Sequence, residues 1–92
     1  MTIEEQRETY RQQFARELAD LLGTTVEALP SSVSKADAAT FLGLKNPRTL
    51  NVWASSGRHG IAMLKVGRDT RPMTAWLLDM KAGAVRIAEA AA

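Results

Sequence analysis

Glycine and proline residues divide this chain into short segments, and their spacing limits the elements that it can form. Gly23, Gly43, Pro47 and the loop 56–60 (SGRHG) each stand between stretches of apolar pattern. Glycine commonly ends a helix, and proline fits the first helical position, where its missing N–H costs nothing. With 92 residues, the chain has room for one modest core and therefore for a single domain.

Residues 3–22 are predicted to form an amphipathic helix, with Thr2 as its cap and Gly23 at its end. The apolar side chains recur at a spacing close to 3.6 residues, and they are Ile3, Tyr10, Phe14, Leu18 and Leu21. Such a stripe packs on its own domain in most proteins. Contact between two copies of the chain is the competing interpretation, and its candidate residues are Tyr10, Phe14, Leu18 and Leu21.

Two more short helices are predicted in the middle of the chain, after a single helical turn at 26–29. Ser34 can cap the first of them, which ends at Gly43. Asn46 and Pro47 open the second, which runs to about residue 55. Leu50 and Trp53 are expected to face the core from this second helix. For Asn46, helix capping is the favoured role, and contact with a ligand is the alternative.

An extended hairpin is predicted over residues 61–71, with a tight turn at 67–69 (GRD). Pro72 is expected to end the pairing because proline has no N–H to donate. Thr74 is then placed to cap a final helix. That helix either ends at Gly83 or continues through an alanine-rich tail.

The order helix, glycine turn, helix, hairpin, helix predicts a mainly α fold with a small β-hairpin. Two short helices joined by a tight turn describe a helix-turn-helix, and a hairpin just after it can act as a wing. The expected class is a winged helix-turn-helix with an extra amphipathic helix in front. The predicted organisation is an N-terminal helical extension (1–33), the winged core (34–83) and a helical or frayed tail (84–92).

Charge is distributed unevenly along the chain, although the formal net charge is only +2. Residues 1–34 carry three basic and six acidic side chains, a net of −3. Residues 35–72 carry seven basic and two acidic side chains, a net of +5, and residues 73–92 balance. A compact basic block in a nearly neutral protein is what a surface that binds a polyanion needs.

Several function classes lack the residues that they need. Cysteine is absent and there is one histidine, so the sequence offers no disulfide framework and no cysteine or histidine cage for a metal. It also contains no glycine-rich phosphate loop, no paired catalytic carboxylates and no Ser-His-Asp set. We therefore expect no enzyme activity, no cofactor and no metal. The apolar stretches are too short to span a bilayer, and no signal peptide is evident, so a cytoplasmic location is expected.

The segment 34–80 resembles the small winged helix-turn-helix proteins of the MerR-like and excisionase group. This group includes recombination directionality factors of phages and integrative elements, and AlpA-type regulators. The matching residues, in order, are Ala38-Ala39, Phe41-Leu42-Gly43-Leu44, Pro47-Arg48-Thr49-Leu50, Val52-Trp53, Ser56-Gly57-Arg58, Lys65-Val66-Gly67-Arg68 and Trp76. The resemblance implies sequence-selective binding of double-stranded DNA. Residues 1–33 have no counterpart in the minimal family pattern and suggest an added interface.

Chemistry gives roles to the polar side chains of the basic block. Arginine is the commonest reader of guanine, and asparagine can pair with adenine, so Arg48 and Asn51 are candidates for base contact. Lysine suits phosphate, and the N–H groups that begin the second helix are expected to bind a phosphate too. Arg68, at the hairpin tip, is the best candidate for a minor-groove or backbone contact. The complete set of predicted DNA contacts is Lys45, Asn46, Arg48, Thr49, Asn51, Arg58, Lys65, Arg68 and Arg71.

Two functions follow from these patterns. The first is a DNA-binding protein of a mobile element, acting as an excisionase, as a transcriptional regulator or as both. Its partners would be double-stranded DNA, further copies of the chain and an integrase. The second is a protein interaction module that uses the same fold without specific DNA binding.

Overall fold

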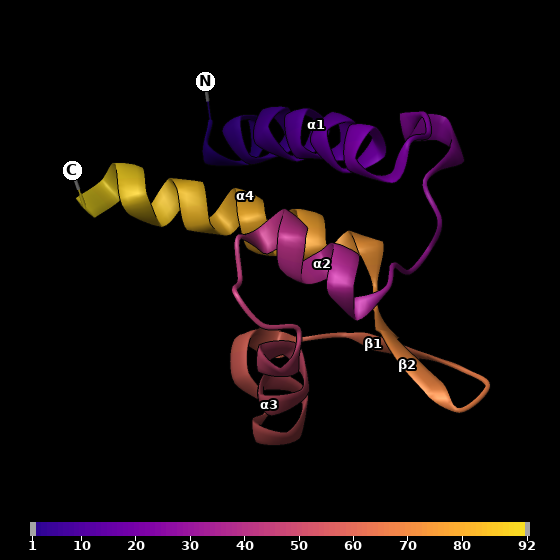
Figure 1. The fold of residues 1–92 in the computed structure, drawn as a ribbon. Helices are drawn as coiled ribbons and strands as arrows, with labels where there is room; N and C mark the ends of the chain where they lie inside the picture. Colours follow the sequence, from indigo (N-terminus) through magenta and orange to yellow (C-terminus); the bar gives the residue numbers. More distant parts are fainter. Residues whose placement is uncertain (1, 92) are drawn as a thin grey trace.

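The computed structural model describes residues 2–91, and the chain is mainly helical with one two-stranded antiparallel sheet. Four α-helices carry most of the structure (Figure 1). The elements are, in order, α1 (Ile3–Leu22), η1 (Val26–Ala28), α2 (Lys35–Leu42), α3 (Arg48–Ser56), η2 (Arg58–Gly60), β1 (Met63–Val66), β2 (Asp69–Pro72) and α4 (Thr74–Ala91). The mainly α class with a small hairpin is therefore confirmed.

Helix α1 begins and ends where the sequence predicts. The hydroxyl of Thr2 accepts the Glu5 N–H at 3.2 Å, which caps the first turn. Gly23 follows the helix with a φ of +69°, a backbone conformation that residues other than glycine rarely adopt. The single turn predicted after it is the 3-10 helix η1.

Helix α2 and the turn to α3 also follow the predicted pattern. Ser34 accepts the Asp37 N–H at 3.1 Å, and Gly43 ends the helix with a φ of +75°. The Leu44 N–H then donates to the Ala39 carbonyl at 2.8 Å, which satisfies an end-of-helix acceptor and turns the chain sharply toward α3.

The hairpin differs from the prediction at both ends of its second strand. The turn contains two residues, Gly67 and Arg68, and Asp69 already pairs with Val66. The φ of Gly67 is +63°, the sign that the first central residue of a type II′ turn needs. Pro72 does not end the pairing, because it stands opposite Met63.

Proline is tolerated there because its position in the ladder needs no N–H donor. The next residue along, Met73, donates its N–H to the Ala62 carbonyl at 2.9 Å, so Pro72 and Met63 form a non-hydrogen-bonded pair. The Pro72 carbonyl instead accepts the Val33 N–H at 3.1 Å, beside an isolated bridge between Ser32 and Met73. The hairpin base is therefore tied to the segment that precedes α2.

Helix α4 continues through Gly83 to Ala91, so the continued helix is the alternative that the structure shows. Thr74 is the first residue of this helix rather than its cap. Its hydroxyl donates to the Pro30 carbonyl at 2.6 Å, 44 residues earlier in the chain. The expected cap therefore serves as a tie between the start of α4 and the segment after η1.

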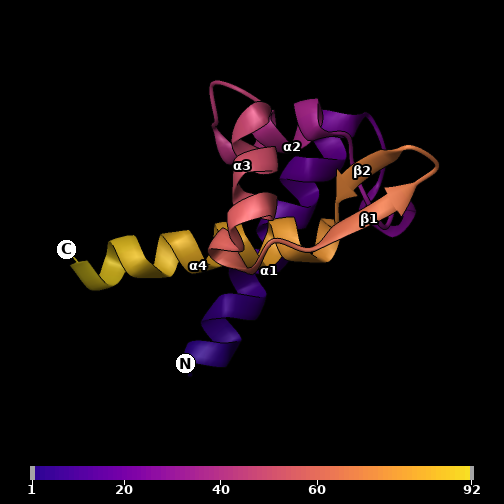
Figure 2. The same ribbon diagram turned by 90° about the horizontal axis from the view of Figure 1, so that it is seen from below.

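One hydrophobic core joins α1, α2, α3 and α4. Phe14 and Leu18 from α1 are buried with Leu50 from α3 and Leu77 from α4. Helix α1 is thus part of the folding core of residues 34–83, not an appendage to it. Figure 1 shows α1 and α4 at one end of the molecule and α3 with the hairpin at the other, and the view from below shows the hairpin extending away from α3 (Figure 2).

The residues proposed for contact between copies are therefore mostly occupied within one chain. Phe14 and Leu18 are buried, and Tyr10 is partly buried and stacks on Phe14 with ring centroids 6.3 Å apart. Packing on the protein's own domain, the other interpretation of the stripe, is what the structure shows for these three. Only Leu21 is well exposed, at 41%.

Among the described side chains, two ion pairs join α1 to α4. Arg11 Nε lies 3.0 Å from Asp79 Oδ1, although its N–H makes no hydrogen bond to that oxygen. Lys81 Nζ lies 3.3 Å from Glu17 Oε2 and donates to the Phe41 carbonyl at 2.9 Å. The same ammonium group lies 4.1 Å from the centroid of the Phe41 ring, so it connects three helices through a cation–π contact as well.

Candidate nucleic-acid interface

Helix α3 turns one polar face toward solvent. Leu50 is fully buried and Trp53 is partly buried against the core, as predicted, and these two residues fix the rotation of the helix. The side chains on the opposite face are exposed, and they are Arg48, Asn51, Val52 and Ser55. Arg48 and Asn51 are therefore exposed together on one helix surface, at positions three residues apart. Thr49 is half-buried and less accessible.

The first N–H groups of α3 already donate within the chain, so they are not free for the phosphate contact that was expected of them. Asn46 Oδ1 accepts the Arg48 N–H at 2.9 Å, so the side-chain amide of Asn46 caps the helix. The Thr49 N–H donates to the Asn46 carbonyl, and the Leu50 N–H donates to the Pro47 carbonyl, each at 3.1 Å. These N–H groups therefore have acceptors within the turn. Lys45, in the same turn, is exposed.

The three cations of the hairpin do not lie on one face. Successive strand residues alternate between faces, so Lys65 and Arg71, which stand opposite Thr70 and Leu64, point to opposite sides. Arg68 lies in the turn and is exposed, whereas Arg71 is half-buried. The hairpin therefore offers Arg68 at its tip, with Lys65 and Arg71 behind it on separate sides.

Two tryptophans and a histidine hold the loop that follows α3. The Trp53 ring packs edge-on against Trp76, with centroids 6.4 Å apart, and tilts against the His59 ring at 4.4 Å. Trp76 Nε1 donates to the His59 carbonyl at 3.0 Å, and His59 has a φ of +59°. These contacts give both tryptophans packing roles, as predicted for Trp53, and they fix the loop that carries the exposed Arg58.

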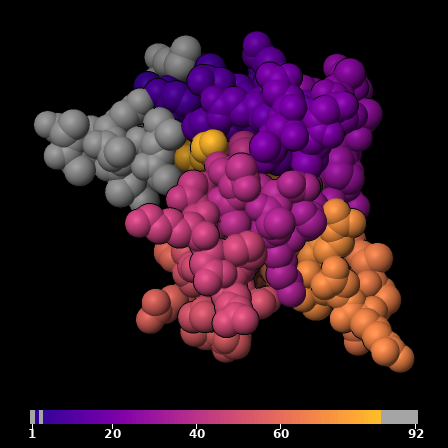
Figure 3. Space-filling model, in the orientation of Figure 1, coloured from indigo at the N-terminus to yellow at the C-terminus, as the bar shows by residue number. Residues whose placement is uncertain are grey.

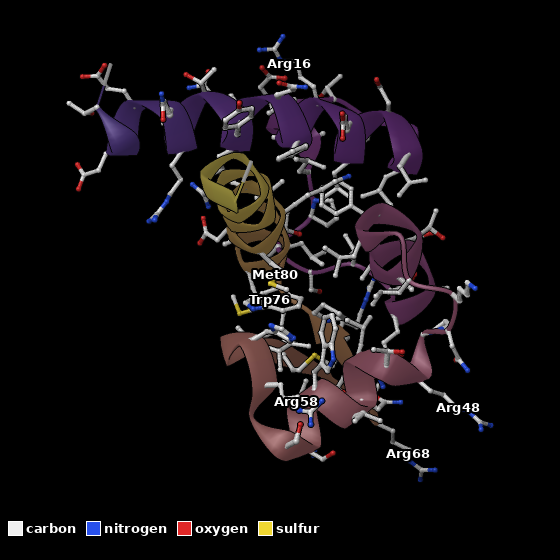
Figure 4. All side chains as sticks on the ribbon, turned by 90° about the vertical axis from the view of Figure 1, so that its left-hand side faces the viewer. Arg16, Arg48, Arg58, Arg68, Trp76 and Met80 are labelled. Atoms are coloured by element: carbon white, nitrogen blue, oxygen red, sulfur yellow. The ribbon has the colours of Figure 1, made fainter. Side chains whose placement is uncertain are left out.

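Viewed as a whole, α3 and the hairpin form two projections at the end opposite α1. The space-filling view shows them separated by a notch (Figure 3). Arg48, Arg58 and Arg68 lie at this end, and Arg16 on α1 lies at the other (Figure 4). None of the predicted DNA-contact cations makes an ion pair with an acidic side chain in the described part of the chain.

Sequence reasoning missed the exposed apolar side chains near these cations. Val52 on α3 is 55% exposed, and Leu64 and Val66 in β1 are exposed as well. The pattern that could have located Val52 is its place two residues after the buried Leu50, because two helical steps rotate a side chain by about 200° to the far side of a helix.

The described residues contain no group of three or more His, Asp or Glu side chains placed to hold a metal ion. No helix between residues 2 and 91 combines the length and apolar character needed to cross a bilayer.

Comparison with known proteins adds no relative. No protein-family model matches the chain, and neither the curated proteins nor the solved structures contain a significant match.

Proposed function

We propose that this protein binds double-stranded DNA with sequence selectivity, and that α2 and α3 act as a helix-turn-helix with the hairpin as its wing. The observation that carries the proposal is the set of exposed cations that have no acidic partner among the described residues, at the end of the molecule that bears α3 and the hairpin. Unpaired cations on two neighbouring projections are suited to the phosphates on either side of a groove.

Helix α3 has the dimensions and side chains for the major groove. A helix with its side chains is about 10–12 Å across, and the major groove is about 12 Å wide and accepts one helix. Arg48 is suited to guanine O6 and N7, and Asn51 to adenine N6 and N7. Arg68 at the hairpin tip would then meet the backbone or the minor groove beside the site, and Lys45 a phosphate at the start of α3.

The biological role that fits this activity is that of an excisionase or a transcriptional regulator of a mobile element. The resemblance of residues 34–80 to the MerR-like and excisionase group supports it. An excisionase bends DNA for an integrase, and bending a short site costs several kcal/mol, which several bound copies can offset. A regulator needs only occupancy of an operator.

The salt dependence of binding tests the proposal. We expect the full chain to bind a 20-bp random duplex in 50 mM salt, with fluorescence anisotropy as the readout. Four or five phosphate contacts would give a slope of log K against log[salt] of about −4. A chain that leaves the random duplex unbound at low salt, or that binds it with no salt dependence, contradicts DNA binding.

A second candidate is a protein interaction module, and the exposed apolar side chains of Leu21 and Val26 favour it. They lie where α1 ends and η1 begins, away from the proposed DNA surface. Contact with a second copy or with an integrase would bury them. Light scattering of the Leu21→Glu variant tests self-association, because this change adds a charge without disturbing the core. An unchanged oligomeric state would rule out a contact between copies at this position.

A further inference from the structure

Val52 is the most exposed of the large apolar side chains in the described part of the chain, at 55%, and it lies in the middle of the proposed recognition helix. Packing does not account for it, because the core side of α3 is formed by Leu50 and Trp53. Helix formation does not account for it either, since valine is a weaker helix former than the common alternatives. An apolar contact outside the folded chain would give this side chain a role.

The polar groups around Val52 divide the outward face of α3 into two halves. Arg48 and Asn51 supply hydrogen-bonding groups in the first half. In the second half, the Ser55 hydroxyl bonds to the Asn51 and Val52 carbonyls, at 3.1 and 3.2 Å, and the Ser56 hydroxyl donates to the Val52 carbonyl at 2.7 Å. These hydroxyl protons are directed into the helix backbone. The second half of the face therefore presents the methyl groups of Val52.

We infer that Val52 contacts the C5-methyl group of a pyrimidine in the major groove, an inference that rests on the proposed DNA-binding function. The C5-methyl is the one apolar feature of base edges in that groove, and short apolar side chains recognise it. A β-branched side chain on a helix has one strongly preferred rotamer, so Val52 presents its methyl groups in a fixed direction. The methyl belongs to thymine or to 5-methylcytosine, at the base pair that faces the middle of α3.

The test begins by selecting the preferred duplex of the full chain from a randomised library. Each thymine of that duplex is then replaced by uracil, which removes only the C5-methyl. We expect one position where uracil weakens wild-type binding about four-fold, the factor that corresponds to the free energy of burying one methyl group. At that position the Val52→Ala variant should bind the two duplexes equally.

The Val66→Ala variant is the matched control, because Val66 is an exposed valine on the hairpin, at 48%. It should keep the full discrimination between thymine and uracil, and circular dichroism should show both variants folded. If no thymine responds, each cytosine of the duplex is methylated at C5 in turn, and one of these changes should strengthen wild-type binding by a similar factor and leave Val52→Ala unaffected.

The outcomes separate this inference from the proposed function. Selective binding with no response to uracil or to cytosine methylation at any position overturns the role of Val52 and leaves DNA recognition intact. A methyl response that Val52→Ala retains in full does the same, because the methyl is then read by another residue. Failure to select any duplex overturns the proposed function and the role of Val52 with it.

Discussion

The α1–α4 end of the molecule and the α3–hairpin end both carry charge, but the charges have different partners. Between α1 and α4, Arg11 pairs with Asp79, and Lys81 pairs with Glu17 and two aromatic rings. At the other end, the cations have no acidic partner among the described residues. Charges that hold the fold are satisfied within the chain, whereas those of the proposed interface are available to a ligand.

The largest expected effect tests whether α1 belongs to the folding core. Leu18 is fully buried, so Leu18→Ala should lower the free energy of unfolding by about 2–5 kcal/mol, measured by urea denaturation. The control Leu21→Ala, at an exposed position of the same helix, should change it by less than about 0.5 kcal/mol. Similar small effects for both would mean that α1 packs loosely and is an appendage after all.

The second prediction distinguishes the two projections at the α3–hairpin end. Arg48→Ala should weaken specific binding by about 1–3 kcal/mol and relax the preference at one base position. Arg68→Ala should weaken specific and random duplexes alike, because a tip cation meets the backbone. Competition titrations with the specific and the random duplex measure how much affinity each variant loses on each of them. Equal losses for both variants on both duplexes would make the assignment of α3 as recognition helix wrong.

The third prediction concerns the charge that joins three helices. Lys81→Met keeps the apolar stem and removes the ammonium that contacts Glu17 and Phe41. We expect a loss of about 1–2 kcal/mol in unfolding free energy, because a carbonyl and an aromatic ring lose their cation. Glu17→Gln removes only the more exposed partner and should cost less than about 1 kcal/mol. An equal cost for both would place the energy in the ion pair alone.

The smallest expected effect concerns charge far from the proposed interface. Glu8 is exposed on α1, and Glu8→Gln should change DNA affinity less than twofold at 0.15 M salt, where the Debye length is about 8 Å. Lys65→Gln, on the hairpin, should lower it by several-fold and reduce the salt slope by about 1. A larger effect at Glu8 would bring α1 into the DNA contact.

The element order was predictable because local chemistry decides it. Gly23 and Gly43 end helices at a positive φ, and the hydroxyls of Thr2 and Ser34 cap them, all within a few residues of sequence. The Pro72 pairing was not predictable, since it depends on the strand register that makes Pro72 and Met63 a non-hydrogen-bonded pair.

The features of the candidate site also differ in whether the sequence could predict them. Arg48 lies two residues before the buried Leu50, on the far side of the helix, so its exposure could be predicted from the sequence. The occupied N–H groups at the start of α3 depend on the conformation of the turn, and the opposite faces of Lys65 and Arg71 depend on strand register. Neither the turn conformation nor the strand register can be predicted from residue type alone.

The joint at the base of the hairpin has a consequence for how such a protein can change over evolutionary time. The Thr74 N–H donates to the Ser31 carbonyl at 2.9 Å, next to the Val33–Pro72 bond, so the hairpin base, the segment before α2 and the start of α4 meet at one point. The tip at Gly67 and Arg68 contributes nothing to this joint. Substitutions at the tip can therefore retune what the hairpin touches, while those at the joint change the angle at which it is presented.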